Sequence, residues 1–350
     1  MAVVGAGNLG QAQAGHLASL GHEVRLYNRR AERLAALGGE IRLGGLLSGT
    51  QRPGRLTTDL AEAITGAQIL FLDVPATAHA DLARLLAPLL GDPAPLLVLH
   101  PGQTFGAYLF AAALREAGIS EPPPIAELQT ALFTARLTPA GEATVLAIKR
   151  RVGAAVFPRT AAAALTPLRE LYPQLVPAPS TLHTALSNVQ ALIHPAVCLA
   201  NLTRIDRGES LRIYREGLSP ALDDLIEQAD RERMAIAAAL GVRVPTAVQW
   251  FALSYGVADR TAVRAMRRVR AYDQILGPTN LSTRLLLEDV PAGLVPIVSL
   301  GEHLRVAVPT LRALRDLAAA VCGDPLIEQG WTVERLGLSG RAAADLRKAF

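Results

Sequence analysis

Three glycines near the start of the chain, Gly5, Gly7 and Gly10, have the spacing Gly-x-Gly-x-x-Gly. In a loop of this kind the first glycine allows a tight turn, the second lets the backbone approach a pyrophosphate, and the third lets helix and strand pack closely. The unpaired N–H groups at the start of the following helix are donors to an anion, and the helix dipole favours negative charge there. With Asn8 and Leu9 inside the loop, the motif predicts a dinucleotide-binding site.

A second strand, expected over residues 23–27, indicates which dinucleotide the loop binds. Its end should meet the adenosine ribose, and Asn28 stands there in place of the acidic residue that usually holds the ribose hydroxyls of NAD. Arg29 and Arg30 follow, and a guanidinium can clamp a 2′-phosphate with two parallel hydrogen bonds. The alternative is a solvated, charged start of a helix. We favour the first interpretation, which predicts NADPH (NADP) as the cofactor.

The second half of the chain has few polar side chains on apolar helices. His194 precedes Pro195 on such a helix and shares a face with Gln190. A lone histidine in this setting is more often a core residue than a catalyst. Arg284 and Asp289 stand in an apolar, turn-rich stretch, where a weak surface ion pair is the simplest explanation. A histidine bonded to a carboxylate is nevertheless a tuned general acid/base, and an arginine can bind a carboxylate substrate.

The elements that must position these residues change character along the chain. Buried parallel strands are expected over 68–74 and 95–100 with a helix over 81–90 between them, and Pro75 follows the first strand at its carboxyl end, where ligands lie in such sheets. This alternation predicts an α/β Rossmann domain with a doubly wound, mostly parallel sheet. Further expected elements are strands over 127–136, 143–149 and 153–157 and a helix over 160–171.

The proline-rich stretch 175–180 marks the expected domain boundary. We therefore expect an NADP-binding domain over 1–180 and an all-α substrate and catalytic domain over 181–350. The candidate helices of the second domain are 185–201, 220–240, 246–255, 260–265, 309–321 and 342–350.

Length and composition bound the class of protein. A chain of 350 residues exceeds the usual single-domain size, and 50% hydrophobic against 19% charged residues is typical of globular proteins. No apolar run reaches the roughly 20 residues that span a bilayer, so no membrane contact is expected. A net charge of +4 and a pI of 9.4 favour anionic small molecules over nucleic acid, because no nucleic-acid-binding motif is present. The first strand begins almost at Met1, which suggests an N-terminus that is trimmed or derived from a fusion.

Cys198 and Cys322 lie in apolar surroundings without metal-ligand spacing. We expect two buried, inert thiols, no bound metal, and a reducing, cytoplasmic location.

Nearly the whole chain resembles the octopine/nopaline dehydrogenase family, the opine dehydrogenases, including the branch that makes opine metallophores. The shared blocks of the first half are GAGNLG at 5–10, VPATAH at 74–79, HPGQTFGA at 100–107 and the segment 127–136. Those of the second half are Ile-His-Pro at 193–195, YREGLSP at 214–220, DRERMAI at 230–236 with ALG at 239–241, and the stretch 283–291. The last three blocks, in that order, are far more specific than the glycine loop.

In that family the histidine before proline is the catalytic acid/base, the aspartate before Val-Pro orients it, and an arginine upstream binds the substrate carboxylate. The resemblance assigns these roles to His194, Asp289 and Arg284, in a cleft between the two domains. It implies an NAD(P)-dependent oxidoreductase that acts on CH–NH donors, and it leaves room for a homodimer. Leu285 and Ala292 replace residues that are usually aromatic in the family. The resemblance therefore does not identify the amine substrate.

The implied reaction is NADPH-dependent reductive condensation of an amino acid, or an aminobutyrate-extended amino acid, with a 2-keto acid (pyruvate or 2-oxoglutarate) through an imine. In the metallophore branch this is the last step of opine metallophore synthesis.

Two other functions stay open on the sequence alone. A ketopantoate-type reductase would reduce a carbonyl without an amine, but that class relies on a lysine as acid, and the helical half offers little besides Lys348. A regulatory protein that senses NADP without catalysis would keep the glycine loop and the two arginines. It would not need the set of His194, Arg284 and Asp289.

Overall fold

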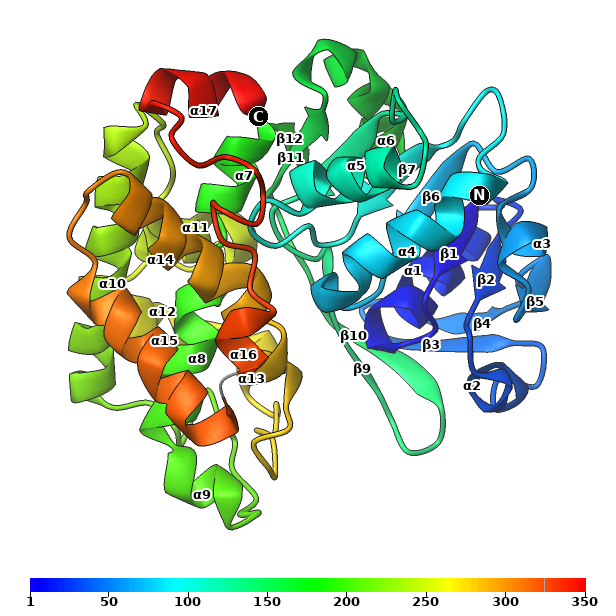
Figure 1. The fold of residues 1–350 in the computed structure, drawn as a ribbon. Helices are drawn as coiled ribbons and strands as arrows, with labels where there is room; N and C mark the ends of the chain where they lie inside the picture. Colours follow the sequence, from blue (N-terminus) through cyan, green and yellow to red (C-terminus); the bar gives the residue numbers. More distant parts are fainter. Residues whose placement is uncertain (324) are drawn as a thin grey trace. The chain divides into compact units, whose positions relative to one another are not determined.

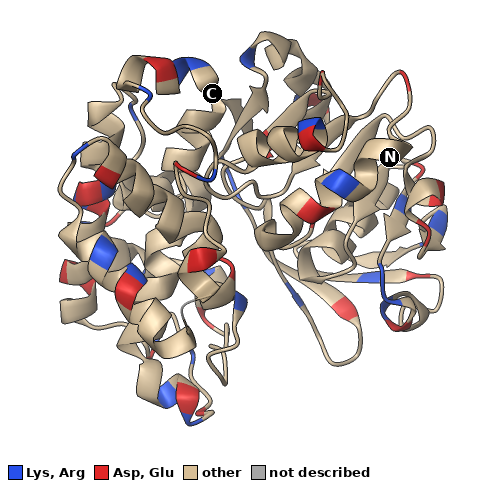
Figure 2. Ribbon diagram, viewed as in Figure 1, with Lys and Arg blue, Asp and Glu red and all other residues tan. Residues whose placement is uncertain are grey.

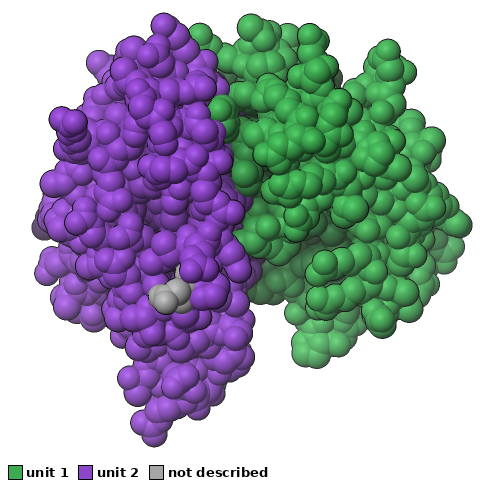
Figure 3. All heavy atoms as spheres, in the orientation of Figure 1, with its two compact units in different colours: residues 1–102, 107–177 green, residues 103–106, 178–350 purple. Residues whose placement is uncertain are grey.

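The computed structural model describes residues 1–323 and 325–350. They form two compact units, one made of residues 1–102 and 107–177, the other of residues 103–106 and 178–350 (Figure 3). The division falls after Pro177, within the proline-rich stretch. The short segment 103–106, which the sequence places in the first domain, belongs to the second unit.

An eight-stranded sheet forms the centre of the first unit (Figure 1), with the strand order β12-β11-β8-β7-β6-β1-β2-β5. All neighbouring strands pair in parallel except β8 and β11. The strands are β1 (Ala2–Val4), β2 (Arg25–Tyr27), β5 (Arg55–Thr57), β6 (Ile69–Leu72), β7 (Leu96–Leu99), β8 (Ile125–Leu128), β11 (Val152–Phe157) and β12 (Leu175–Pro177). Because β1 lies between β2 and β6, the strand order reverses at β1, and the predicted doubly wound, mostly parallel sheet is confirmed.

Apolar side chains cover both faces of this sheet. Val3 lies in one core while Ala2 and Val4 lie in the other, and the strands β1, β6 and β7 carry no charged residue (Figure 2). Burial on both faces explains why these strands are continuous apolar runs rather than alternating ones. The helices of this unit are α1 (Asn8–Ser19), α2 (Ala31–Ala35), α3 (Leu60–Ile64), α4 (His79–Leu86), α5 (Gly106–Glu116) and α6 (Thr166–Leu171).

A second, four-stranded sheet has the order β4-β3-β10-β9 and contains β3 (Ile41–Gly45), β4 (Gly49–Gln51), β9 (Phe133–Leu137) and β10 (Glu142–Ile148). The single strand expected over 127–136 is therefore wrong, since β8 ends at Leu128 and β9 begins at Phe133 in the other sheet. The chain between them is held by other contacts: Gln129 N donates to Gly153 O, and Leu132 O accepts from Lys149 N. The helix expected over 160–171 is also shorter, because 3₁₀ geometry replaces its first part over Arg159–Leu165.

The described part of the second unit is helical apart from one isolated β-bridge between Arg212 and Leu276. The predicted all-α character is confirmed. Its helices are α7 (Thr181–Leu186), α8 (Gln190–Ala200), α9 (Leu202–Asp206), α10 (Pro220–Ala239), α11 (Ala247–Tyr255), α12 (Ala262–Arg268), α13 (Arg284–Leu287), α14 (Val295–His303), α15 (Pro309–Cys322), α16 (Pro325–Glu328) and α17 (Ala343–Ala349). The helix expected over 185–201 is split by a short turn at residues 187–189, and its second part, α8, packs against α10, α13 and α15.

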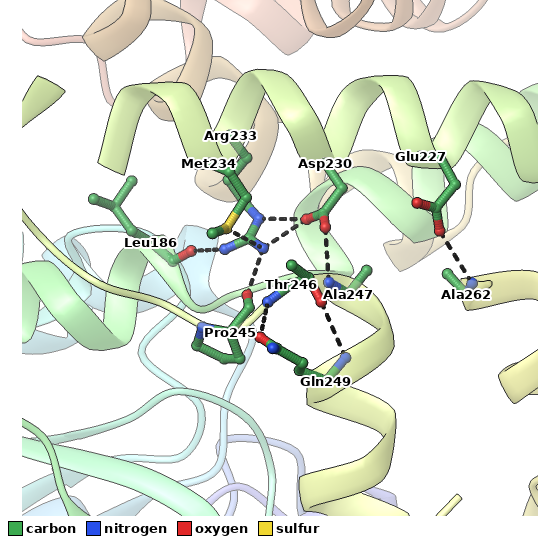
Figure 4. A network of polar contacts seen from close by, with 10 residues as sticks. All are labelled: Leu186, Glu227, Asp230, Arg233, Met234, Pro245, Thr246, Ala247, Gln249 and Ala262. Carbon is green, nitrogen blue, oxygen red and sulfur yellow. Dashed lines mark hydrogen bonds and ion pairs between the residues drawn. The ribbon is translucent and has the colours of Figure 1, made fainter. Parts of the chain in front are cut away.

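A buried ion pair on α10 ties three segments of the helical unit together (Figure 4). The guanidinium of Arg233 is fully buried and donates to Asp230 Oδ1 through Nε at 2.9 Å and Nη2 at 2.6 Å. It also donates to the carbonyls of Leu186, at the end of α7, and Pro245, while Asp230 Oδ2 accepts from Ala247 N at the start of α11. Each charge is thereby paired and hydrogen-bonded, which a buried charge requires.

The two cysteines differ in exposure. Cys198 is buried as expected, whereas Cys322, at the end of α15, is partly exposed, so that part of the expectation is wrong. Burial, with a smaller contribution from the Asp289 charge, raises the pKa of the Cys198 thiol to about 12. Among the described residues, no helix is both long and apolar enough to cross a bilayer.

Candidate functional site

The glycine loop connects β1 to α1. Glycine is required at Gly5 and Gly10 for steric reasons, whereas Gly7 is not crowded. Gly5 has a φ of +114°, and a Cβ there would lie 2.3 Å from the carbonyl oxygen of Asp73. A Cβ at Gly10 would lie 1.7 Å from the Gly5 oxygen, so both positions exclude any side chain. Gly7, by contrast, faces open space, since nothing lies within 4 Å of a Cβ built there.

Gly7 is also the N-cap of α1, and among the described residues no side-chain cap is formed at the start of this helix. Asn8 does not cap it, because its Oδ1 accepts from Leu137 N at 3.0 Å. Open space in front of uncapped donors at the start of a twelve-residue helix is the arrangement that binds a phosphate. The residues of this loop therefore fit a dinucleotide pyrophosphate. Leu9, the remaining loop residue, is partly buried.

The residues expected to meet the adenosine ribose follow the end of β2. Asn28 N donates to Thr57 O on the neighbouring strand β5, and Asn28 Oδ1 accepts from Arg30 N at 2.9 Å. Arg29 and Arg30 are exposed, and neither forms an ion pair with any residue that the structure describes. Pro75 is exposed at the carboxyl end of β6. The predicted cofactor residues thus all belong to one unit and follow the carboxyl ends of β1, β2 and β6.

A second feature of this region was not anticipated from the sequence. Asp73 and His100, which follow β6 and β7, form a fully buried pair with 2.7 Å between Oδ1 and Nδ1. His100 Nε2 accepts from Leu132 N at 2.7 Å, so the ring is neutral and its Nδ1–H donates to Asp73. Burial raises the pKa of Asp73, and its interaction with His100 opposes that effect. Through His100, this pair holds Leu132 at the end of the parallel sheet.

The helical unit brings His194 and Asp289 together. His194 Nδ1 lies 2.8 Å from Asp289 Oδ2. The His194 side chain is 12% exposed and that of Asp289 1%. Because an ionised carboxylate only accepts hydrogen bonds, the proton of the neutral ring is on Nδ1, and Nε2 is the ring nitrogen that does not face Asp289.

The position of Asp289 depends on a π-helical turn over Val290–Leu294 that follows it. Gly293 allows this turn to approach α8 closely, since a Cβ there would lie 2.8 Å from the Cβ of Ala191. A π-helical turn is rare and is frequently found at functional sites.

Arg284 lies one helical turn before Glu288, and its Nε is 3.3 Å from Glu288 Oε2. The arginine side chain is 63% exposed while that of Glu288 is 5% exposed, so the guanidinium is paired with a buried carboxylate through Nε and most of the arginine side chain is in contact with solvent. The Glu288 charge raises the pKa of Arg284 further, and the Asp289 charge contributes in the same direction. Arg284 O also accepts from Asp289 N at 3.3 Å. The structure thus places His194, Asp289 and Arg284 in one region. Arg284 pairs with Glu288, the residue that precedes Asp289 in the chain.

Gln103 is a site residue that residue-by-residue reasoning missed. Its side-chain nitrogen donates to Asp289 Oδ1 at 3.0 Å and approaches Glu288 Oε1 at 3.4 Å. Its side-chain oxygen accepts from Asn188 Nδ2 at 2.6 Å. Gln103 has a φ of +58°, a left-handed conformation that costs a residue with a side chain about 1–2 kcal/mol. The only signal in the sequence was its place in the block HPGQTFGA.

The two halves of the chain match different family models. Residues 177–322 match the family described as NAD/NADP octopine/nopaline dehydrogenase, alpha-helical domain, and residues 1–126 match the N-terminus of NAD-dependent glycerol-3-phosphate dehydrogenase. The chain is 38% identical over 352 residues to an opine dehydrogenase of Arthrobacter sp. strain 1C, covering 99% of this chain and 98% of that protein.

Solved structures show the same fold. A structure of octopine dehydrogenase with NADH and L-arginine superposes with a TM-score of 0.79 at 22% identity, covering 100% of this chain and 98% of that one. A structure of yersinopine dehydrogenase with NADP⁺ bound gives a TM-score of 0.69 at 18% identity, covering 99% of this chain and 96% of that one.

Proposed function

Because the chain belongs to the opine dehydrogenase family, we propose that His194 and Asp289 are the catalytic acid/base and its partner in the reductive condensation of an amino acid with a 2-keto acid. The enzyme is an NAD(P)-dependent oxidoreductase that acts on CH–NH donors. The hydrogen bond of 2.8 Å between His194 Nδ1 and Asp289 Oδ2 is the observation that carries the assignment of roles.

The proton steps follow from this geometry. The amine of an amino acid is a nucleophile only after it loses a proton, and His194 Nε2 is the free base that takes it. Asp289 stabilises the imidazolium that results and keeps the ring in the orientation that exposes Nε2. The amine adds to the keto carbon, and His194 returns the proton to the resulting hydroxyl group. That group leaves as water, so the imine forms in its protonated state. When bound, the nicotinamide cofactor supplies the hydride that reduces the imine carbon.

Arg284 is the proposed ligand of the keto-acid carboxylate. One side of its guanidinium is paired with the buried Glu288, which orients it, while 63% of the side chain is exposed. A guanidinium matches a carboxylate with two parallel hydrogen bonds and so aligns the keto carbon as well as binding it.

We further propose that Gly5, Gly7, Asn8, Leu9, Gly10 and Pro75 line the dinucleotide site and that the cofactor is NADPH. The open space at Gly7 and the uncapped start of α1 support a pyrophosphate there. Asn28 has no negative charge to repel a 2′-phosphate, and Arg29 and Arg30 are exposed beside it.

The test is a screen of cofactor oxidation with pairs of 2-keto acids and amines. The panel includes pyruvate and 2-oxoglutarate, ordinary amino acids, and the aminobutyrate-extended amino acids that a role in metallophore synthesis requires. We expect oxidation of NADPH only when both a keto acid and an amine are present. Oxidation of NADPH at the full rate with a keto acid alone would contradict the condensation and indicate simple ketone reduction. Of the two lysines in the chain, the helical unit contains only Lys348, whose side chain is 78% exposed, so a lysine acid has little support.

A further inference from the structure

Asp289 is one member of a longer chain of buried hydrogen bonds in the helical unit. Asn188 Nδ2 donates to Gln103 Oε1 at 2.6 Å, Gln103 Nε2 donates to Asp289 Oδ1 at 3.0 Å, and Asp289 Oδ2 pairs with His194 Nδ1 at 2.8 Å. Asn188 and Gln103 are each 2% exposed, so water does not compete for these bonds.

The direction of each bond in this chain is determined by chemistry. The carboxylates of Asp289 and Glu288 accept and cannot donate, so the Gln103 amide must turn its nitrogen toward them. Its oxygen then faces the other way and requires a donor, which Asn188 supplies. Without that donor the Gln103 amide loses the contact that fixes its orientation, and a rotated amide would place an oxygen against Asp289 Oδ1.

Asn188 is itself held rigidly. It lies in the turn between α7 and α8, where Asn188 N donates to Ala185 O and Ser187 N donates to His183 O. The buried guanidinium of Arg233 donates to the carbonyl of Leu186 at the end of α7 (Figure 4). The turn is therefore anchored by Arg233, whose hydrogen bonds in the described part of the chain go to Asp230, Leu186, Met234 and Pro245.

Gln103 is fixed by its backbone as well. Thr104 N donates to Ala292 O at 3.1 Å within the π-helical turn that follows Asp289. Gln103 and Phe105 both have left-handed backbone conformations, with φ of 58° and 66°. Such strain in residues with side chains is retained where the surrounding structure over-determines it, and it is concentrated at functional sites.

We infer that Asn188, acting through Gln103, is a positioning residue that holds Asp289 in the rotamer presenting Oδ2 to His194. The inference rests on the proposed role of the His194–Asp289 pair. It explains why two amides that carry no charge are buried beside two carboxylates. Outer-shell residues that orient the ligands of a metal contribute about 10- to 100-fold to activity, and we expect an effect of that size here.

The variant Asn188→Leu tests this inference, because leucine has nearly the same shape and cannot donate. We expect kcat for reductive condensation to fall about 10- to 100-fold, with the KM values for keto acid and cofactor close to those of wild type. Asn201→Leu is the matched control. Asn201 is also buried, and its Nδ2 donates to the carbonyls of Val197 and Gly217, outside the chain of bonds to Asp289.

A spectroscopic measurement separates positioning from a general loss of structure. In protein labelled with ¹⁵N-histidine, His194 should show a single Nδ1–H tautomer, and the His194→Gln variant identifies its signal among the seven histidines. In Asn188→Leu the two tautomers should mix, whereas Asn201→Leu should keep one. Should Asn188→Leu fail to fold, Asn188→Ala removes the same donor without adding bulk.

The outcomes distinguish this inference from the proposed function. Normal turnover in folded His194→Gln contradicts the proposed function itself. Loss of turnover in His194→Gln together with a wild-type rate and a single tautomer in Asn188→Leu overturns only the role of Asn188. In the Asp289→Asn background, Asn188→Leu should lower turnover little further. Additive losses of turnover in the double variant would also overturn the role of Asn188.

Discussion

Asp289 holds His194 from one side only: its Oδ2 lies 2.8 Å from His194 Nδ1, while its Oδ1 accepts from the Gln103 amide. The carboxylate is almost fully buried, and the His194 side chain keeps a small exposed fraction. A base arranged in this way has one nitrogen fixed by the protein and one available to a substrate. This division of the two nitrogens is the basis of the first prediction.

We expect His194→Ala to lower kcat about 10²- to 10⁴-fold while cofactor affinity stays near that of wild type, because general acid/base catalysis is lost and the dinucleotide loop is untouched. Asp289→Asn should also lower kcat strongly, since an amide can neither fix the Nδ1–H tautomer nor stabilise an imidazolium. Steady-state kinetics of both single variants and the double variant measure the coupling. Additive losses in the double variant would show that the two residues do not act as a unit.

Arg284→Ala should differ from these variants in kind. Its main effect should be a higher KM for the keto acid, because the guanidinium is proposed to bind the substrate carboxylate. Arg284→Lys keeps the charge but not the two parallel hydrogen bonds, so it should recover only part of the loss. Arg312→Ala, an exposed arginine that pairs with Glu302, serves as the control for a general change in surface charge. An unchanged KM for the keto acid with a lower kcat would contradict a role of Arg284 in substrate binding and would assign it to the chemical step.

NADPH should bind more tightly than NADH, and the double variant Arg29→Ala/Arg30→Ala should lose that preference. Charge-assisted bonds to a 2′-phosphate correspond to about 10- to 100-fold in affinity. Titration of both cofactors into wild type and variant, followed by fluorescence, gives the two dissociation constants directly. Equal affinities in the wild-type protein would contradict the assignment. The affinity for NADH is the internal control, since it should change little.

Lys149 should make the first unit less stable toward lower pH. Burial lowers the pKa of Lys149 from 10.5 to about 7, although its Nζ donates to Ala131 O. Between these two values the unfolded chain binds more protons than the native state, so the free energy of unfolding rises with pH across this window. Below pH 7 the cost of the buried charge is fully present, and it amounts to a few kcal/mol.

The corresponding variant is Lys149→Met, measured by urea unfolding at several pH values between 6 and 10. It should be more stable than wild type at pH 6, and the difference should shrink toward pH 10, where the wild-type amine is neutral. Lys348→Met is the matched control because Lys348 is exposed. The same pH dependence in wild type and Lys149→Met would argue against a buried titrating amine.

The buried pair of Asp230 and Arg233 should respond unequally to single and double substitution. Asp230→Ala leaves the guanidinium buried without its partner and should cost about 3–5 kcal/mol of stability. Replacement of both, as Asp230→Leu/Arg233→Met, should be milder because no unpaired charge is left. Thermal unfolding of the variants, with Arg312→Ala as an exposed control that should cost less than about 1 kcal/mol, measures the difference. A double variant as unstable as Asp230→Ala would mean that the hydrogen bonds to Leu186 and Pro245 matter more than the charges.

Features that depend on neighbours along the chain could be predicted from local patterns. The glycine loop, the start of α1 and the strands β6 and β7 were predictable in this way. Turn geometry, helix capping and burial on both faces of a sheet each require particular residue types within a few positions. The division into a Rossmann-type half and a helical half follows from the same local periodicities. The family resemblance added the roles of His194, Asp289 and Arg284, which spacing alone does not show.

Contacts between segments that are far apart in the chain could not be predicted in this way. His194 and Asp289 are 95 positions apart, and Gln103 and Asp289 are 186 apart, so their hydrogen bonds depend on packing between segments that share no local signal. The close approach of α8 to the π-helical turn through Gly293 is one such contact. For the same reason the stretch 127–136 gave no sign that β8 and β9 belong to different sheets. Strand pairing is a contact between distant residues, and the alternation of side chains within one strand does not record its partner.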